Sequence, residues 1–349
     1  MGANQMGARA LGLQLGAHGW AHGWLTFGPR FISAECWLAV FDLLEPSQLG
    51  LGIAFVSHRF DFYVDEHFKT RRWALKPMEI KAKFEADGTN GMEIVNYDGN
   101  PLPIPQKAMP KKVVGFKRIS IKFIDQNAIA FLQHFRQHFA FCPINLSIDT
   151  DSDRRILDLI LHNIWPMIVK NICAMRLYAR IFYRLRRFVP SILNDCPSLR
   201  VINAFSDGFF VEFPANDSAN ALDGQALAKW LFTPLPDNVP KVFKCWLQQW
   251  YMNLNSSIEA FKAAFANASS PVNFIVVIWI STPFAFPDER CRPFLLIRCP
   301  IVRDTDKWAK WEKEAIDWQF NDQWNIIDIQ INNEHEMDVD TGPSDQEKK

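Results

Sequence analysis

The chain has 349 residues, of which 48% are hydrophobic, so it is long enough to bury a sizeable core. Lysine plus arginine number 38 and aspartate plus glutamate also number 38, which gives a formal net charge of zero. Without a net positive field, the composition argues against partners such as nucleic acid or an anionic membrane surface. Seven cysteines without a Cys-x-x-Cys pair favour reduced thiols in a cytoplasmic or nuclear protein and predict no zinc site.

The first 30 residues are glycine-rich and repeat the tetrapeptide Ala-His-Gly-Trp. They lack the basic start and the continuous apolar core of a secretory signal, so we expect a flexible segment over residues 1–30. The longest apolar run, at 274–280, is far shorter than the roughly 20 residues that span a bilayer. It predicts a buried strand, and no membrane association is expected.

Residues 31–75 carry the pattern of three short helices. Ser33 is a suitable N-cap, Glu35 stands where the helix dipole favours a carboxylate, and Pro46 can end one helix and open the next. Apolar residues recur at helical spacing: Trp37, Leu38, Phe41 and Leu44, then Leu49, Ile53 and Val56, then Phe60, Val64 and Phe68. A segment this short and this apolar barely offsets its chain entropy, so we expect a partner surface to complete it.

Residues 76–112 differ in composition. A turn cluster at 87–91 separates two short candidate strands, and four prolines follow between 101 and 110. We expect a hairpin and then a proline-rich linker between two units.

Strand and helix patterns alternate from 113 to 331. The candidate strands lie at 118–124, 144–148, 174–178, 199–204, 241–247, 272–281, 294–299 and 325–331. Most are separated by amphipathic segments, at 128–139, 154–170, 181–194, 219–232, 256–267 and 305–318. This pattern predicts an α/β fold, with α+β as a second possibility: an irregular βα array similar to leucine-rich repeats, or alternatively a closed doubly wound sheet. Residues 332–349 are acidic and polar, which predicts a disordered tail.

Two stretches of the helical segment resemble the F-box. One is Ile-Ser-Ala-Glu-Cys-Trp-Leu-Ala-Val-Phe-Asp-Leu-Leu from Ile32, and the other is Val-Ser-His-Arg-Phe from Val56. Compared with the usual Leu-Pro-x-Glu and Val-Cys-Lys/Arg-x-Trp, Ser33 replaces proline and Phe60 replaces tryptophan. The wider span 32–331 resembles the expanded F-box family of plant-parasitic nematodes, through residues 48–54, 64–69, 102–105, 195–200, 224–231, 295–303 and 306–312.

This resemblance implies an adaptor without catalytic activity or cofactor. An F-box binds Skp1 and, through Skp1, the cullin of an SCF-type ubiquitin ligase, while residues 113–331 would recruit a protein substrate. The implied Skp1 contacts are Ile32, Glu35, Trp37, Leu38, Phe41, Leu44, Leu49, Ile53, Val56 and Phe60, where apolar anchors would fill a groove. A ligase-independent interaction protein with a degenerate F-box is the alternative.

Four other patterns are compared with simpler explanations. Asp-Thr-Asp-Ser-Asp at 149–153 is similar to a phosphotransferase or calcium loop, but carboxylates beside a helix N-terminus are the favoured interpretation. A hydrolase using Asp149 and Asp151 remains a third hypothesis. His134 and His138 lack a third metal ligand, so a solvated helix face is favoured. Three tryptophans at 308, 311 and 318 predict core packing. A basic stripe is formed by Arg176, Arg180, Arg184 and Arg187. A solvated helix face with partial ion pairing is the favoured interpretation, and contact with an acidic substrate or a phosphate is the alternative.

Overall fold

The protein is represented by a computed structural model. It describes residues 32–44, 46–69, 73–84, 90–103, 113–150, 154–204, 210–248, 254–267, 272–281 and 293–331. The expected flexible segment at 1–30 and the expected acidic tail at 332–349 lie outside the described residues.

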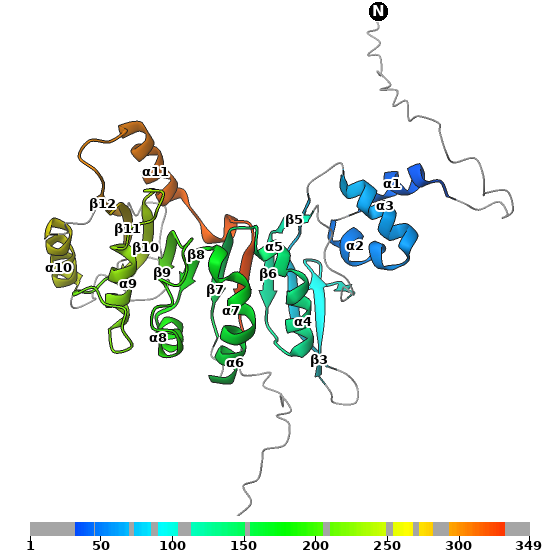
Figure 1. Ribbon diagram of the computed structural model, residues 1–349, viewed down its shortest axis with the longest axis horizontal. Helices are drawn as coiled ribbons and strands as arrows, with labels where there is room; N and C mark the ends of the chain where they lie inside the picture. The colour runs from blue at the N-terminus through cyan, green and yellow to red at the C-terminus, as the bar shows by residue number, and fades with distance from the viewer. Residues whose placement is uncertain are drawn as a thin grey trace, which may run out of the picture.

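The N-terminal part is helical. It consists of α1 (Ala34–Phe41), α2 (Pro46–Leu51), the 3-10 turn η1 (Ile53–Phe55) and α3 (His58–Lys69). Pro46 is the first residue of α2, a position where its missing N–H would have no partner inside the helix in any case. Figure 1 shows these helices grouped at one end of the molecule, beside a long sheet. We call them the helical module.

The rest of the described chain is mixed α/β, built on one 11-stranded mixed sheet. The strand order is β12-β11-β10-β9-β8-β7-β13-β6-β2-β3-β4. The strands are β2 (Met78–Phe84), β3 (Asn90–Asn96), β4 (Pro101–Leu102), β6 (Arg118–Ile121), β7 (Ile144–Ile148), β8 (Ile172–Leu177), β9 (Val201–Ala204), β10 (Lys241–Gln248), β11 (Phe274–Ser281), β12 (Phe294–Arg298) and β13 (Ile326–Ile329). All eight strands expected after residue 113 are confirmed. A separate parallel pair joins β1 (Trp73–Leu75) to β5 (Val113–Phe116).

Strands β7 to β11 are parallel and neighbour one another in chain order. The helices between them are α6 (Arg154–Leu159), the π-turn η2 (Ile160–Ile164), α7 (Trp165–Ile168), the 3-10 turn η3 (Val169–Asn171), α8 (Ala179–Phe188), α9 (Asp223–Leu231) and α10 (Leu254–Asn267), while α4 (Gln126–His134) and α5 (Arg136–Phe139) precede β7. Right-handed crossovers that all advance in one direction place their helices on one face of the sheet. Accordingly, residues from α4 to α10 share one apolar core with the strands.

The sheet faces are set by two adjacent register rows. The apolar row comprises Ile119, Ile327, Leu146, Met175, Ile202, Phe243 and Val276, all buried in the core beneath the helices. One residue further along each strand lies a polar row of Ser120, Asp328, Ser147, Arg176, Asn203 and Lys244, on the opposite face. The alternation thus gives the sheet one apolar face and one largely polar face.

The C-terminal segment contains the expected helix and strand, but the sequence did not indicate which strands the last one joins. After β12 the chain forms α11 (Thr305–Asp317) and the 3-10 turn η4 (Phe320–Asp322), and then β13 inserts between β6 and β7. Helix α11 covers the face opposite α10, because Trp308 and Ala315 pack with Ile275 and Val277, whereas Val276 belongs to the other core. The core role expected for Trp308 is confirmed, while Trp318 lies just beyond the end of α11.

The segment expected as a hairpin and linker is part of the sheet. Strands β2 and β3 form the predicted antiparallel hairpin, but β2 also pairs in parallel with β6. The hairpin therefore extends the sheet instead of separating two units, because Ile80 and Ile94 contribute buried side chains to the main core. The expected linker is in part wrong, because Pro101 begins strand β4; its residues 104–112 lie outside the described residues. No helix of the described chain is both long and apolar enough to cross a membrane.

Candidate docking surface

Both long helices of the helical module begin at a serine cap. The Ser33 hydroxyl accepts a hydrogen bond from the backbone N–H of Cys36 at 3.3 Å, and the Ser57 hydroxyl accepts one from the N–H of Phe60 at 3.3 Å. Glu35 lies in the first turn of α1, where its charge complements the helix dipole. The serines that differ from the usual F-box pattern therefore have a local structural role.

The module has a small core of its own. Phe41, Leu49, Ala54, Val64 and Phe68 are buried there, and no residue of this cluster belongs to the main core. Half-buried side chains surround it: Trp37, Leu38, Leu44, Ile53, Phe60 and Tyr63. The ring of Trp37 meets that of Phe60 edge-on, with centroids 4.9 Å apart. The helices are therefore held together mainly by one another.

A second set of apolar residues, on α1 and at its two ends, is exposed. Cys36 and Val40 lie about one turn apart on α1, Ile32 precedes the N-cap Ser33, and Leu43 lies in the turn after the helix. All four of these apolar residues are exposed. Leu43 is 85% exposed, the largest fraction given for a large apolar residue in the described part of the module. Val56 and Phe62 add further exposed apolar area. We call Ile32, Cys36, Val40 and Leu43 the outer stripe; its exposed apolar side chains are of the kind that protein partners cover.

The structure divides the ten predicted Skp1 contacts into three groups. Ile32, Glu35 and Val56 are exposed and available for contact. Five are half-buried and already packed within the module: Trp37, Leu38, Leu44, Ile53 and Phe60. Phe41 and Leu49 have no exposed surface, so their assignment as contacts is corrected: they stabilise the helices and do not present a surface.

Sequence reasoning missed Cys36, Val40 and Leu43. The signal was present, because α1 is apolar at two sets of helical positions, and only one set can face α2 and α3. The set that contains the aromatic residues was chosen as the docking face. Large aromatic side chains gain most from burial, so these residues fill the internal core and leave the smaller aliphatic set outside.

The predicted arginine stripe is corrected. Arg176 lies on strand β8, on the polar face of the sheet, whereas Arg180, Arg184 and Arg187 lie on helix α8. The guanidinium of Arg176 stacks 4.3 Å from the ring centroid of Phe320 and donates to Asn321 Oδ1 at 3.1 Å. The four arginines therefore do not form one surface, although the three on α8 share a helix face.

Residues 316–323, here called the crossing segment, lie over the polar row. Asn321 accepts hydrogen bonds from Arg118 and Arg176, on strands β6 and β8. Arg118 also forms an ion pair of 2.8 Å with Asp328, which is almost fully buried. Lys244 donates to the carbonyl oxygens of Ile316 and Trp318, and burial lowers the pKa of Lys244 to about 8. This part of the polar face is consequently occupied by the protein's own chain.

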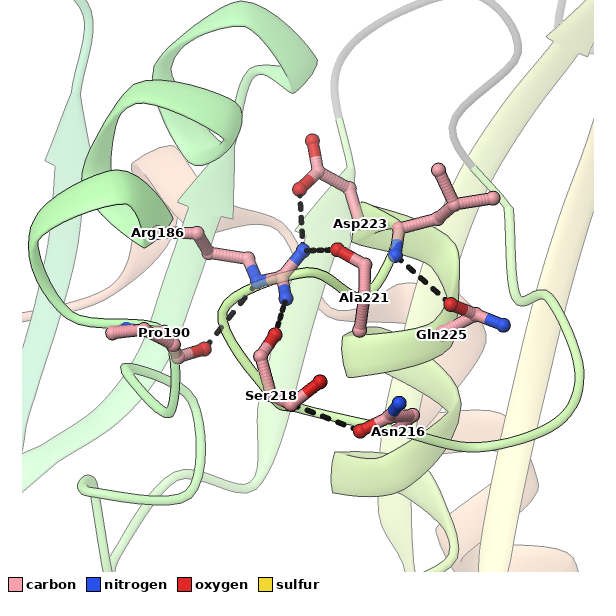
Figure 2. Close-up of polar contacts among 8 residues, drawn as sticks. Arg186, Pro190, Asn216, Ser218, Ala221, Asp223 and Gln225 are labelled. Carbon is pink, nitrogen blue, oxygen red and sulfur yellow. Dashed lines mark hydrogen bonds and ion pairs between the residues drawn. The ribbon is translucent and has the colours of Figure 1, made fainter.

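A fifth arginine, Arg186, forms the most elaborate polar cluster of the described chain, and sequence reasoning did not single it out. Figure 2 shows its guanidinium donating to the carbonyl oxygens of Pro190, Ser218 and Ala221 and to Asp223. Its side chain is only 5% exposed, and the ion pair with Asp223 measures 2.8 Å. The Arg186 guanidinium on α8 binds acceptors in the loop that precedes α9. The cluster therefore holds this loop against α8 and has a structural role.

The remaining motifs are not brought into a catalytic or metal-binding arrangement among the described residues. Asp149 pairs with Arg180 at 2.9 Å, and residues 151–153 lie outside the described residues. His138 is buried, which corrects the expected solvated face, while His134 is half-buried. Within the described chain, no group of three His, Cys, Asp or Glu side chains lies close enough to hold a metal ion. A small crevice lined by residues of β7, α7, β8 and α8 has room for about one water molecule.

Comparison with known proteins adds no relative. No family model, no curated protein and no solved structure matches this chain.

Proposed function

We propose that the chain is an F-box adaptor of the cytoplasm or nucleus, which binds Skp1 through the helical module and recruits a protein substrate to an SCF-type ubiquitin ligase. In this proposal the ligation chemistry belongs to other subunits. The observation that carries it is the outer stripe: a capped helix with an internal core behind it exposes Val40, and the residues flanking the helix, Ile32 and Leu43, are exposed as well. Helix faces of this kind dock into apolar grooves through anchors about one turn apart.

The rest of the chain supports the second half of the proposal. A rigid parallel array with strands β7 to β11 in chain order is the kind of scaffold on which repeat-like proteins build extended recognition surfaces. The crossing segment covers the polar row, so we assign substrate recognition to the remaining surface of the domain, including the arginines of α8. The identity of the substrate is set by contacts that no local motif encodes.

The proposal is tested by measuring Skp1 affinity for the full-length chain and for two matched variants. Leu43→Asp places a charge on the outer stripe, and Phe141→Asp places one at an equally exposed apolar residue between α5 and β7. Loss of a central apolar anchor costs about 2 kcal/mol or more, so Leu43→Asp should weaken Skp1 binding by at least about 30-fold. Phe141→Asp should bind like the unmodified protein. An unmodified chain that does not bind Skp1 would refute the proposal.

The same variants address the ligase-independent alternative. Substrate partners captured equally by the unmodified chain and by Leu43→Asp, without Skp1 in either sample, would favour an interaction protein with a degenerate F-box. Point variants are preferable to removal of residues 1–112, because that removal would delete β2, β3 and β4 from the sheet.

A further inference from the structure

Helix α8 turns a row of arginines away from the sheet. Arg180, Arg184 and Arg187 are spaced by four and three residues, so they lie on one side of the helix. The opposite side packs into the main core through Ile181 and Leu185, which are both buried. Arg180 and Arg187 are exposed, and Arg184 is half-buried. The helix therefore presents a positively charged face to solvent.

A second helix extends this positive charge. Figure 1 shows α6 and α8 near the same edge of the sheet. Arg154, the first residue of α6, is exposed, and its guanidinium lies over the ring of Phe188 at the end of α8, 5.4 Å from the ring centroid. Because Phe188 directly follows Arg187, this contact brings Arg154 to the arginine row. We call the following residues the basic face: Arg154, Arg180, Arg184 and Arg187.

The end of the described chain lies close to the basic face. The backbone carbonyl of Ile331 accepts a hydrogen bond of 2.6 Å from the Thr150 hydroxyl, and Ile331 is buried. Asp149, the neighbour of Thr150, pairs with Arg180 at 2.9 Å. The segment that begins at Asn332 is therefore tethered beside the first arginine of α8.

This segment carries the complementary charge. Residues 334–340, which lie outside the described residues, read Glu-His-Glu-Met-Asp-Val-Asp, with a carboxylate at every second position. In an extended chain alternate side chains point the same way and lie about 7 Å apart, which is close to the helical pitch of about 5.4 Å that separates neighbouring arginines of α8. The nine residues 332–340 can span about 30 Å, whereas Arg180 and Arg187 are only about 10 Å apart along the helix. Both the length and the charge spacing of the segment fit the basic face.

We propose that residues 334–340 dock on the basic face of their own molecule and cover its arginines. The tether gives the segment an effective concentration of the order of millimolar, so several ion pairs that are each weak can act together. Arg180 keeps its ion pair with Asp149, because a guanidinium has five N–H donors and can bind a second acceptor. The docking itself is independent of Skp1. One consequence rests on the proposed function: an acidic substrate of the α8 arginines competes with the protein's own segment.

Arginine modification by phenylglyoxal, followed by mass spectrometry of the full chain alone, tests the docking. A fourfold variant neutralises the alternating carboxylates: Glu334→Gln, Glu336→Gln, Asp338→Asn and Asp340→Asn. A control variant neutralises two later carboxylates: Asp345→Asn and Glu347→Gln. Neither variant changes a residue of the sheet. Modification of Arg184 and Arg187 should be at least about threefold faster in the fourfold variant, which corresponds to a segment docked for about two-thirds of the time or more.

Two controls accompany this comparison. In the control variant, Arg184 and Arg187 should react as slowly as in the unmodified protein. Arg303, an exposed residue between β12 and α11, should react at one rate in all three proteins. At about 1 M salt, where the Debye length is about 3 Å, the unmodified protein should react as fast as the fourfold variant.

Equal modification rates of Arg184 and Arg187 in the unmodified protein and the fourfold variant overturn the proposal. Protection that grows with protein concentration overturns it as well, because a second copy would then occupy the basic face. Loss of protection in the control variant would contradict the assignment to residues 334–340. Since no Skp1 and no substrate are present, these outcomes are separate from the test of the proposed function.

Discussion

Replacement of Phe41 by alanine would separate the internal core of the helical module from its docking surface. The Phe41 side chain is fully buried and contacts the rings of Trp37, Phe60 and His67, with centroid distances of 6.4, 6.4 and 5.9 Å. A buried aromatic side chain removes about 150–250 Å² from water, which at about 25 cal/mol per Å² corresponds to roughly 4–6 kcal/mol. Measured Phe→Ala substitutions cost about 3–5 kcal/mol, in agreement with this range.

Because the module and the sheet have separate cores, the loss should remain local. We expect Phe41→Ala to abolish hydrogen-exchange protection over α1 and α3, while the amides of β7 and β8 stay protected. Leu43→Asp, two residues away but 85% exposed, should change the protection of neither part, since surface substitutions usually alter stability by less than about 0.5 kcal/mol. Equal loss of protection in the module and in the sheet would refute the separation of the two cores.

Three further predictions concern the sheet. Burial lowers the pKa of Lys241 to about 7, against 10.5 when unfolded, so the unfolded chain binds more protons than the folded chain between these pH values. The free energy of unfolding should therefore rise with pH from about 7 upward. Lys241→Met should flatten this rise, as measured by urea unfolding at several pH values. Arg118→Ala leaves the buried carboxylate of Asp328 without its cationic partner and should lower the free energy of unfolding by about 3–5 kcal/mol. Arg118→Leu combined with Asp328→Asn should recover part of this loss, as judged by the midpoints of urea unfolding. A Cβ at Gly115 would lie 2.5 Å from Asn325 Oδ1, which accepts a hydrogen bond from the N–H of Phe116. Gly115→Ala should therefore destabilise the fold by about 1–3 kcal/mol. An unchanged midpoint of thermal unfolding would contradict this.

Local patterns predicted most of the secondary structure. The strands and helices of the array are set by apolar periodicity, and the cap at Ser33 follows from side-chain chemistry. The position of β13 between β6 and β7 could not be read in this way. Its burial on both faces indicates a central strand, but the choice of neighbours depends on contacts about 200 residues apart.

The site was predicted in part. Sequence periodicity identified an apolar helical module with two apolar faces, yet it could not decide which face turns inward, because that choice depends on how α2 and α3 pack against α1. Arg176 illustrates a second limit. The strand expected at 174–178 is confirmed and contains Arg176, so its four-residue spacing from Arg180 does not put it on the helix face, because the helix begins only at Ala179. Arg186 was missed because its acceptors are mainly backbone carbonyl groups, which carry no sequence signal.

The central claim is that the outer stripe of α1 is completed by Skp1. Cys36 is an exposed thiol within that stripe, whereas Cys142, Cys196 and Cys245 are buried. The alkylation rate of Cys36 therefore reports whether a bound partner shields the stripe from solvent. Mass spectrometry of iodoacetamide-treated protein, with and without saturating Skp1, provides the measurement. The account predicts that Skp1 slows alkylation of Cys36 at least tenfold and that Leu43→Asp removes this protection. Bound Skp1 that leaves the alkylation rate of Cys36 unchanged would contradict it.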